Sequence, residues 1–214
     1  MLAKNPAAGV KLFRVDNKLE RYMGEPELQR LMNVLWTDEN RTVCRIALLL
    51  LSTGCRLNEV LQATWSDIDR DTRVLRIRAS NSKSKRIRSV PLNDSALDVI
   101  AELDTEGHFE HLFINHRSGR PYGTIAKVWD RLRKAAELPN LRLHDLRHQF
   151  ASMLVNGGRS LYEVQMILGH KDPSVTQRYA HLSTRSLQEA ANSASVAIRG
   201  ATTTTIKEND HAHT

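Results

Sequence analysis

The sequence predicts a mainly α-helical domain with one small three-stranded antiparallel β-sheet. In most segments after residue 24, apolar residues recur at the helical spacing i, i+3, i+4, i+7. One stretch, 72–90, instead alternates basic and apolar residues, which is typical of strands. Helix caps and glycines separate these segments. The 214 residues, 41% hydrophobic and 26% charged, are enough for one packed domain.

The first half of the chain contains three predicted helices. Residues 24–36 begin with Pro26 in the first turn and form an apolar face, which comprises Leu28, Leu31, Met32, Leu35 and Trp36. Residues 41–54 are apolar enough for a central helix, and Gly54 ends it. A short helix is expected within 56–65.

Residues 72–78 and 86–90 are predicted to form a β-hairpin with one basic face and one apolar face. The apolar face consists of Val74, Leu75, Ile77, Ile87 and Val90. Residues 111–115 are the candidate third strand. Between residues 70 and 90 there is one acid, Asp71, and the basic residues are Arg70, Arg73, Arg76, Arg78, Lys83, Lys85, Arg86 and Arg88. This segment therefore carries the chain's whole net charge of +7, and it suits a phosphate backbone.

Six further helices are predicted in the second half. Asn93 or Asp94 caps the helix in 93–103. The next two helices are 123–138 and 144–158. Their apolar residues are expected to face the core, and these are Ile125, Val128, Trp129, Leu132, Ala136, Leu146, Phe150 and Met153. Residues 160–169 open with a capping box and end at Gly169. Asp172 and Pro173 then start a helix with Tyr179 two turns inside it, and a last helix covers 185–197.

Several classes of protein are disfavoured by what the sequence lacks. There is no run of eighteen apolar residues and no apolar signal-peptide centre near the start, so a cytoplasmic protein is expected. Cys44 and Cys55 have no metal-like spacing and are predicted to be reduced core thiols. No metal is expected at five of the histidines, which are His108, His111, His116, His211 and His213.

The residues suited to chemistry lie at the ends or edges of predicted elements. Arg56 follows a helix stop, Lys83 lies at the hairpin tip, and His144 and Arg147 share one helix face. His170 follows Gly169, and Tyr179 comes nine residues later. Each also has a simpler interpretation: Arg56 could pair with Glu59, Lys83 could be solvated, and Tyr179 could be a core aromatic residue.

Four segments carry these residues in a characteristic order: TGCRLNEVLQATWSDID, SKSKRIRSVPL, LRLHDLRHQFAS and LGHKDPSVTQRYAHL. In these segments the chain resembles the catalytic domain of the tyrosine recombinase (phage integrase) family. The resemblance covers 24–197 and implies the fold of that catalytic domain. It also implies that 1–23 is a linker from an absent N-terminal DNA-binding domain, while the polar residues 198–214 are expected to be disordered.

The resemblance implies an active site made of Arg56, Lys83, His144, Arg147, His170 and Tyr179, with Glu59 as the supporting acid. Lys85 is an alternative to Lys83, because family members often have a glycine at the hairpin tip and this chain reads NSKSKR there. The basic segment adds the expected DNA-binding residues, which are Arg76, Arg78, Lys85, Arg86 and Arg88.

The implied reaction is attack of a tyrosine hydroxyl on a DNA phosphodiester. It leaves a 3′-phosphotyrosyl bond and a free 5′-hydroxyl, and it needs no metal or nucleotide cofactor. Arg56 and Arg147 would bind the non-bridging oxygens. His170 would donate a further hydrogen bond, His144 would accept or relay the tyrosine proton, and Lys83 would protonate the leaving oxygen.

The implied partner is a double-stranded DNA recombination site, which a homotetramer of the protein would bind. A protein bound to DNA in this way would be associated with the nucleoid. Whether the free chain is a monomer, and whether the tyrosine acts on its own protomer's site, stay open. Two alternatives also stay open. One is a type IB topoisomerase-like enzyme that relaxes DNA, and the other is a DNA-binding protein without catalysis.

Overall fold

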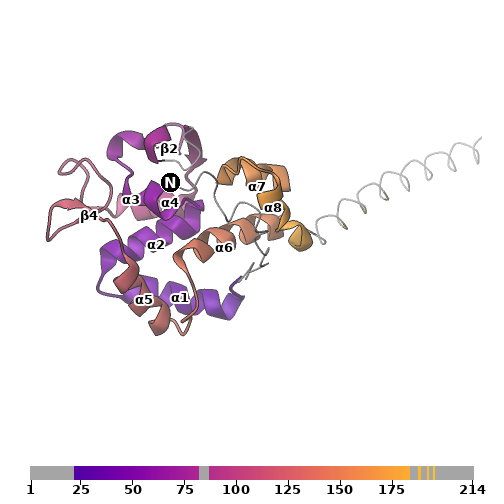
Figure 1. Ribbon diagram of the computed structural model, residues 1–214, viewed down its shortest axis with the longest axis horizontal. Helices are drawn as coiled ribbons and strands as arrows, with labels where there is room; N and C mark the ends of the chain where they lie inside the picture. Colours follow the sequence, from indigo (N-terminus) through magenta and orange to yellow (C-terminus); the bar gives the residue numbers. More distant parts are fainter. Residues whose placement is uncertain (1–21, 82–86, 184–187, 189–191, 193–194, 196–214) are drawn as a thin grey trace, which may run out of the picture.

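Helices make up most of the computed structural model, which describes residues 22–81, 87–183, 188, 192 and 195 (Figure 1). The predicted helices of the first half are confirmed as α1 (Glu25–Thr37), α2 (Arg41–Thr53) and α3 (Leu57–Leu61). Asn40 caps α2 by accepting a hydrogen bond from the Val43 amide at 3.1 Å. Gly54 ends α2 in the left-handed conformation, with φ at 63°. The α2 helix is buried and packs against α1, α4 and α6.

The sheet has three antiparallel strands in the order β1 (Ile68–Asp69), β2 (Val74–Ile77) and β3 (Arg88–Pro91). The hairpin prediction is confirmed, with Leu75 opposite Val90. The predicted third strand is wrong. Residues Ile114–Asn115 form β4, which pairs with β5 (Arg120–Pro121) across a local turn in a separate two-stranded sheet. The edge beside β2 is taken by β1, because that segment is only a short turn away along the chain.

The second half contains α4 (Asp94–Ala101), α5 (Ala126–Ala135), α6 (Leu143–Asn156), α7 (Leu161–Leu168) and α8 (Ser174–Gln177). Asn93, not Asp94, caps α4. The Ser160–Glu163 capping box opens α7, and Gly169 ends it with φ at 66°. Tyr179 does not lie inside a helix as predicted. It lies two residues after the end of α8, because the chain there tightens into the 3₁₀ turn η3 (Ala180–Ser183).

Two clusters of buried apolar residues hold these elements together. The larger cluster surrounds α2, and the smaller one contains Phe150, Ala151, Val155, Val164, Leu168 and Tyr179. Cys44 and Cys55 are both free and buried, as predicted for core thiols. None of the described helices has the length and apolarity needed to cross a membrane.

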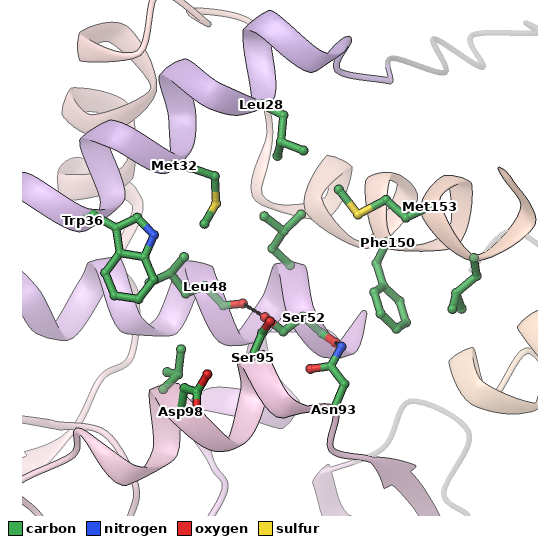
Figure 2. Close-up of a pocket in the computed structure, with 13 residues that line it drawn as sticks. Leu28, Met32, Trp36, Leu48, Ser52, Asn93, Ser95, Asp98, Phe150 and Met153 are labelled. Carbon is green, nitrogen blue, oxygen red and sulfur yellow. Dashed lines mark hydrogen bonds between the residues drawn. The ribbon is translucent and has the colours of Figure 1, made fainter. Parts of the chain in front are cut away.

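Three residues predicted to face the core are exposed instead. Trp36 and Met153 are 47% and 36% exposed, because α1 and α6 flank a groove of about 450 Å³ rather than packing face to face. Figure 2 shows this groove, with Leu28 and Met32 of α1 across from Met153. Ile87, expected on the apolar face of the hairpin, is 74% exposed just before β3 begins. The helical period therefore identified the apolar faces of α1 and α6, but not how fully each face is covered, and Ile87 was assigned to the wrong face of the hairpin.

Candidate active site

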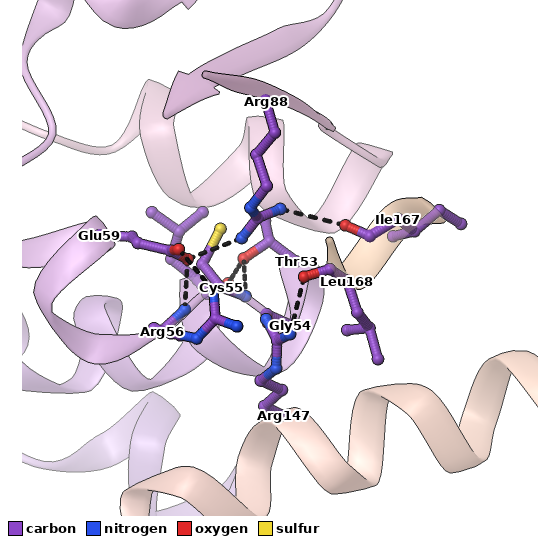
Figure 3. A network of polar contacts seen from close by, with 10 residues as sticks. Thr53, Gly54, Cys55, Arg56, Glu59, Arg88, Arg147, Ile167 and Leu168 are labelled. Carbon is purple, nitrogen blue, oxygen red and sulfur yellow. Dashed lines mark hydrogen bonds and ion pairs between the residues drawn. The ribbon is translucent and has the colours of Figure 1, made fainter. Parts of the chain in front are cut away.

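Arg147 is the residue that connects the elements of the site. It lies in α6 and is only 3% exposed. Its Nη1 donates to the Gly54 carbonyl at 2.6 Å, and its Nη2 donates to the Leu168 carbonyl at 2.7 Å (Figure 3). These carbonyls lie at the ends of α2 and α7, two residues before Arg56 and two residues before His170. One buried guanidinium therefore holds together the chain segments from which two other predicted site residues emerge.

Glu59 is a buried carboxylate, 1% exposed, that accepts hydrogen bonds from two arginines. Arg56 approaches it twice, through Nη1 at 2.9 Å and through its backbone amide at 2.8 Å. Arg88 donates at 2.7 Å to Oε2, the oxygen that also accepts from the Arg56 amide. Glu59 therefore holds the Arg56 side chain and caps α3 at the same time.

Arg88 lies inside this network, although it was expected to contact DNA. In β3 it is two residues from the buried Val90, so both side chains lie on the same face of the strand. Its guanidinium also donates to the Ile167 carbonyl at 3.1 Å, and its side chain is 13% exposed. The alternation of inward and outward residues along the strand could have predicted that Arg88 faces inward.

The charges of the site strongly favour an anion. Three guanidinium groups, those of Arg56, Arg88 and Arg147, lie around the single carboxylate of Glu59 (Figure 3). Burial raises the pKa of Glu59, but Arg88 and Arg56 outweigh it and lower the pKa overall. Burial and the positive charges of Arg56 and Arg88 lower the pKa of Arg147 to about 10. Arg147 thus remains protonated at neutral pH, and the cluster keeps a net positive charge.

His170 links this cluster to the segment that carries Tyr179. Its Nδ1 lies 2.8 Å from the Thr176 hydroxyl in α8, three residues before Tyr179. Burial and the charges of Arg147 and Arg56 lower the pKa of His170 to about 3. The ring is therefore neutral at physiological pH. A pocket of about 330 Å³ opens beside it, lined in part by Arg88, Gly169 and Lys171.

Tyr179 is almost fully buried, 1% exposed, and its hydroxyl lies 2.7 Å from Nδ1 of His148. His148 was not among the predicted site residues, although it directly follows Arg147 in the motif HDLRH. Its ring meets that of His144 edge-on, with the centroids 4.8 Å apart. Burial and the nearby His144 lower the pKa of His148 to about 4. For His144, burial and Arg147 also lower the pKa.

The basic residues of the hairpin are only partly described. Arg76 is exposed and forms an ion pair with Asp69 at 2.6 Å. Arg78, also exposed, pairs with Asp67 at 3.1 Å and donates to the Gln62 carbonyl at 2.9 Å. Lys83, Lys85 and Arg86 lie outside the described residues. Lys83 and Lys85 therefore both stay candidates for the residue that protonates the leaving oxygen.

Comparison with known proteins identifies the family. A family model described as "Phage integrase family" matches residues 21–186. The tyrosine recombinases XerC of Corynebacterium efficiens and Corynebacterium glutamicum are 30% and 32% identical, over 89% and 90% of this chain. The integrase of Salmonella phage P22 is 31% identical over 89% of the chain. The chain spans 63%, 65% and 51% of the lengths of these relatives. It belongs to the phage integrase family.

Solved structures show the same fold. The XerA recombinase has a TM-score of 0.66 and 26% identity, covering 81% of this chain and 64% of its own. The catalytic domain of bacteriophage HP1 integrase has a TM-score of 0.63 and 27% identity, covering 80% of this chain and 93% of its own. The chain therefore has the fold of a tyrosine recombinase catalytic domain, as the sequence motifs predicted.

Proposed function

We propose that this chain is the catalytic domain of a site-specific DNA recombinase that breaks and rejoins strands through a 3′-phosphotyrosyl intermediate. The observation that carries the proposal is the cluster of three guanidinium groups around buried Glu59, joined by Arg147 to the segment of His170. Such a cluster binds an anion with two available oxygens, as a phosphodiester has. Family membership supports the same conclusion.

The reaction assigns roles to five of the six predicted active-site residues. Arg56 and Arg147 hold the non-bridging oxygens and stabilise the negative charge that gathers on them in the transition state. His170, neutral and fixed by Thr176, donates a further hydrogen bond. Tyr179 attacks phosphorus, and Lys83 protonates the departing 5′-oxygen. The ester conserves the energy of the broken strand, so rejoining requires neither nucleotide nor metal.

Arg88 has a positioning role in this proposal instead of a contact with DNA. It holds Glu59, which in turn orients Arg56, and it fixes the Ile167 carbonyl just ahead of His170. The exposed Arg76 and Arg78, together with Lys85 and Arg86, would contact phosphates of the duplex. In this proposal, residues 24–197 form the catalytic unit, with 1–23 as a linker and 198–214 as a tail. The active assembly is a homotetramer on DNA.

The test is a search for a covalent adduct. The protein is incubated with a library of nicked duplexes of randomised sequence, and adducts are recovered under denaturing conditions and sequenced. The wild-type chain should yield adducts, and Tyr179→Phe should yield none while still binding DNA. Tyr162→Phe is the matched control, since Tyr162 is an exposed residue of α7 and the same hydroxyl is removed.

Two results would contradict the proposal. Adducts formed by Tyr179→Phe at the wild-type level would show that another residue is the nucleophile. A wild-type chain that binds DNA but forms no adduct would favour a DNA-binding role without catalysis. A relaxation assay on supercoiled DNA, beside an exchange assay with two sites, separates recombination from topoisomerase-like activity.

A further inference from the structure

We infer that His148 is a further catalytic residue, which accepts the hydrogen bond of the Tyr179 hydroxyl through Nδ1 and sets the position of the attacking oxygen. The inference rests on the proposed function. It begins from the 2.7 Å distance between these two atoms, both of which belong to nearly buried side chains. Among the residues predicted from the sequence, only His144 had been expected to contact this hydroxyl.

The two residues joined by this hydrogen bond lie in elements of different rigidity. Tyr179 follows α8, a helix of four residues, and precedes the 3₁₀ turn η3. Such short elements hold a long aromatic side chain weakly by themselves. His148 lies in the middle of α6, which has 14 residues and packs against α2. The hydrogen bond therefore ties the far end of the tyrosine to a rigid helix.

The same helix carries Arg147, the residue directly before His148. Arg147 is fixed to the carbonyls of Gly54 and Leu168. A phosphate bound by Arg147 and a hydroxyl bound by His148 would thus both be positioned from one turn of α6. Nucleophilic attack depends steeply on the separation and alignment of the reacting atoms, so a common support has a direct effect on rate.

The direction of the hydrogen bond suits the chemistry. When the hydroxyl hydrogen points to Nδ1, this hydrogen bond uses no lone pair of the oxygen that attacks phosphorus. As the oxygen–phosphorus bond forms and the phosphorus–O5′ bond breaks, the phenolic proton passes to Nδ1, and the leaving oxygen takes a proton from Lys83. Rejoining reverses both transfers, so no proton is lost overall.

The protonation state of the free protein agrees with this role. Burial and His144 lower the pKa of His148 to about 4, so Nδ1 is available as an acceptor at neutral pH. A bound phosphodiester brings negative charge close to the ring and favours the imidazolium that forms during attack. Edge-on contact with His144 restricts the tilt of the His148 ring.

The test compares three substitutions in the adduct assay, using one duplex recovered from the library. His148→Asn places an amide oxygen close to where Nδ1 lies, whereas His148→Gln places it close to Nε2, and His148→Leu offers no acceptor. Adduct formation should fall about a hundredfold in the Leu and Gln variants. The Asn variant should remain within about tenfold of wild type. DNA binding should be unchanged in all three.

A second substrate separates the nucleophile from the leaving group. With sulfur in place of the bridging 5′-oxygen, the leaving thiolate needs no proton. The defect of Lys83→Ala should then disappear, while that of His148→Leu should persist. Gln149→Leu is the control for damage to α6, because Gln149 is equally buried but bonds the Met23 backbone. It should leave the adduct rate near that of wild type.

Stability measurements test the bond without relying on catalysis. In urea unfolding, the effect of His148→Leu should largely vanish in a Tyr179→Phe background, since the partner hydroxyl is already gone. Additive effects would overturn the inference. So would a wild-type adduct rate in His148→Leu, and that result would leave the proposed function intact. A wild-type chain without adducts would remove the proposed function and, with it, the catalytic role of His148.

Discussion

At the scale of single residues, Glu59 has an unusual position for an acid in a site proposed to bind an anion. Its carboxylate is buried and joins Arg56 to Arg88, so it neutralises part of the positive charge of the cluster. The benefit is orientation. Without a fixed acceptor, the Arg56 side chain would sample many rotamers, and each would place its N–H groups differently.

Replacing Glu59 by Gln should therefore be costly. Two buried or half-buried guanidinium groups would lose their counter-charge, and the free energy of unfolding should fall by about 3 kcal/mol. Adduct formation should fall as well, since Arg56 is no longer held. Urea unfolding and the adduct assay measure the two effects. Glu102→Gln, which removes an exposed pair with Arg45, is the control and should change little. Equal effects of both substitutions would contradict the role given to Glu59.

The histidines of the site should make stability depend on pH. The pKa values of His148 and His170 are lowered to about 4 and about 3, whereas an unfolded histidine titrates near 6.5. Between these values the unfolded chain binds more protons, so the free energy of unfolding should decrease as pH falls from about 6.5 to about 4. Above pH 7 this contribution should be constant.

Urea unfolding at pH 7, 6 and 5 measures this dependence. The groups that act on His148 are mainly positive: His144, Arg178 and Arg142 lower its pKa, and Asp145 opposes them. His148→Asn removes one titrating ring, so its stability should decline less steeply with falling pH. An identical slope for variant and wild type would show that His148 is not buried in its neutral form.

At the scale of elements, the end of α7 shows how a backbone turn positions the site. Gly169 has φ at 66°, and a Cβ added there would lie 2.5 Å from Cδ of Arg88. The glycine is therefore required for two reasons, the left-handed conformation and the close approach of the Arg88 side chain. The turn directs His170 toward Thr176, while Arg88 passes beside it to reach Glu59.

Gly169→Ala tests these two reasons against a matched control. Gly119 has the same φ of 66° but nothing within 4 Å of an added Cβ. Gly119→Ala should therefore cost only the backbone strain, about 1–2 kcal/mol. Gly169→Ala should cost more, because Arg88 must move, and it should also slow adduct formation. If thermal unfolding showed the same loss of stability for both variants, the contact with Arg88 would not contribute to the cost of Gly169→Ala.

At the scale of the whole molecule, the charge is concentrated rather than spread. Residues 70–90 carry the chain's whole net charge of +7, and Arg88 of this segment belongs to the cluster around Glu59. Arg76 and Arg78 each already pair with an acid, so they reach a duplex only by exchanging one anionic partner for another. Affinity for DNA should consequently depend strongly on competing ions.

Binding to a duplex, followed by fluorescence anisotropy at several KCl concentrations, measures this dependence. The logarithm of affinity should fall linearly with the logarithm of salt concentration. Arg76→Ala should reduce that slope by about 1 and weaken binding to all sequences alike. Arg45→Ala, which removes a charge paired with Glu102 elsewhere on the surface, should leave the slope unchanged. An unaltered slope for Arg76→Ala would remove this residue from the DNA-binding face.

Much of the architecture was predictable because caps and periods are local properties. The ends of α2 and α7 follow from Gly54 and Gly169, and the hairpin follows from its alternating residues. The third strand was not predictable in this way. A two-residue strand such as Ile68–Asp69 has no period of its own and is defined only by the strand beside it.

The sequence alone determined the family and the order of the helices, and it predicted a set of residues suited to binding a phosphodiester, since these depend on local patterns of residue types. Tertiary structure decided which of those residues meet. It turned Arg88 inward onto Glu59 and brought His148 to the Tyr179 hydroxyl. These contacts join residues 29 and 31 positions apart. They exist in a fold where one buried guanidinium, Arg147 of α6, holds the ends of α2 and α7 together.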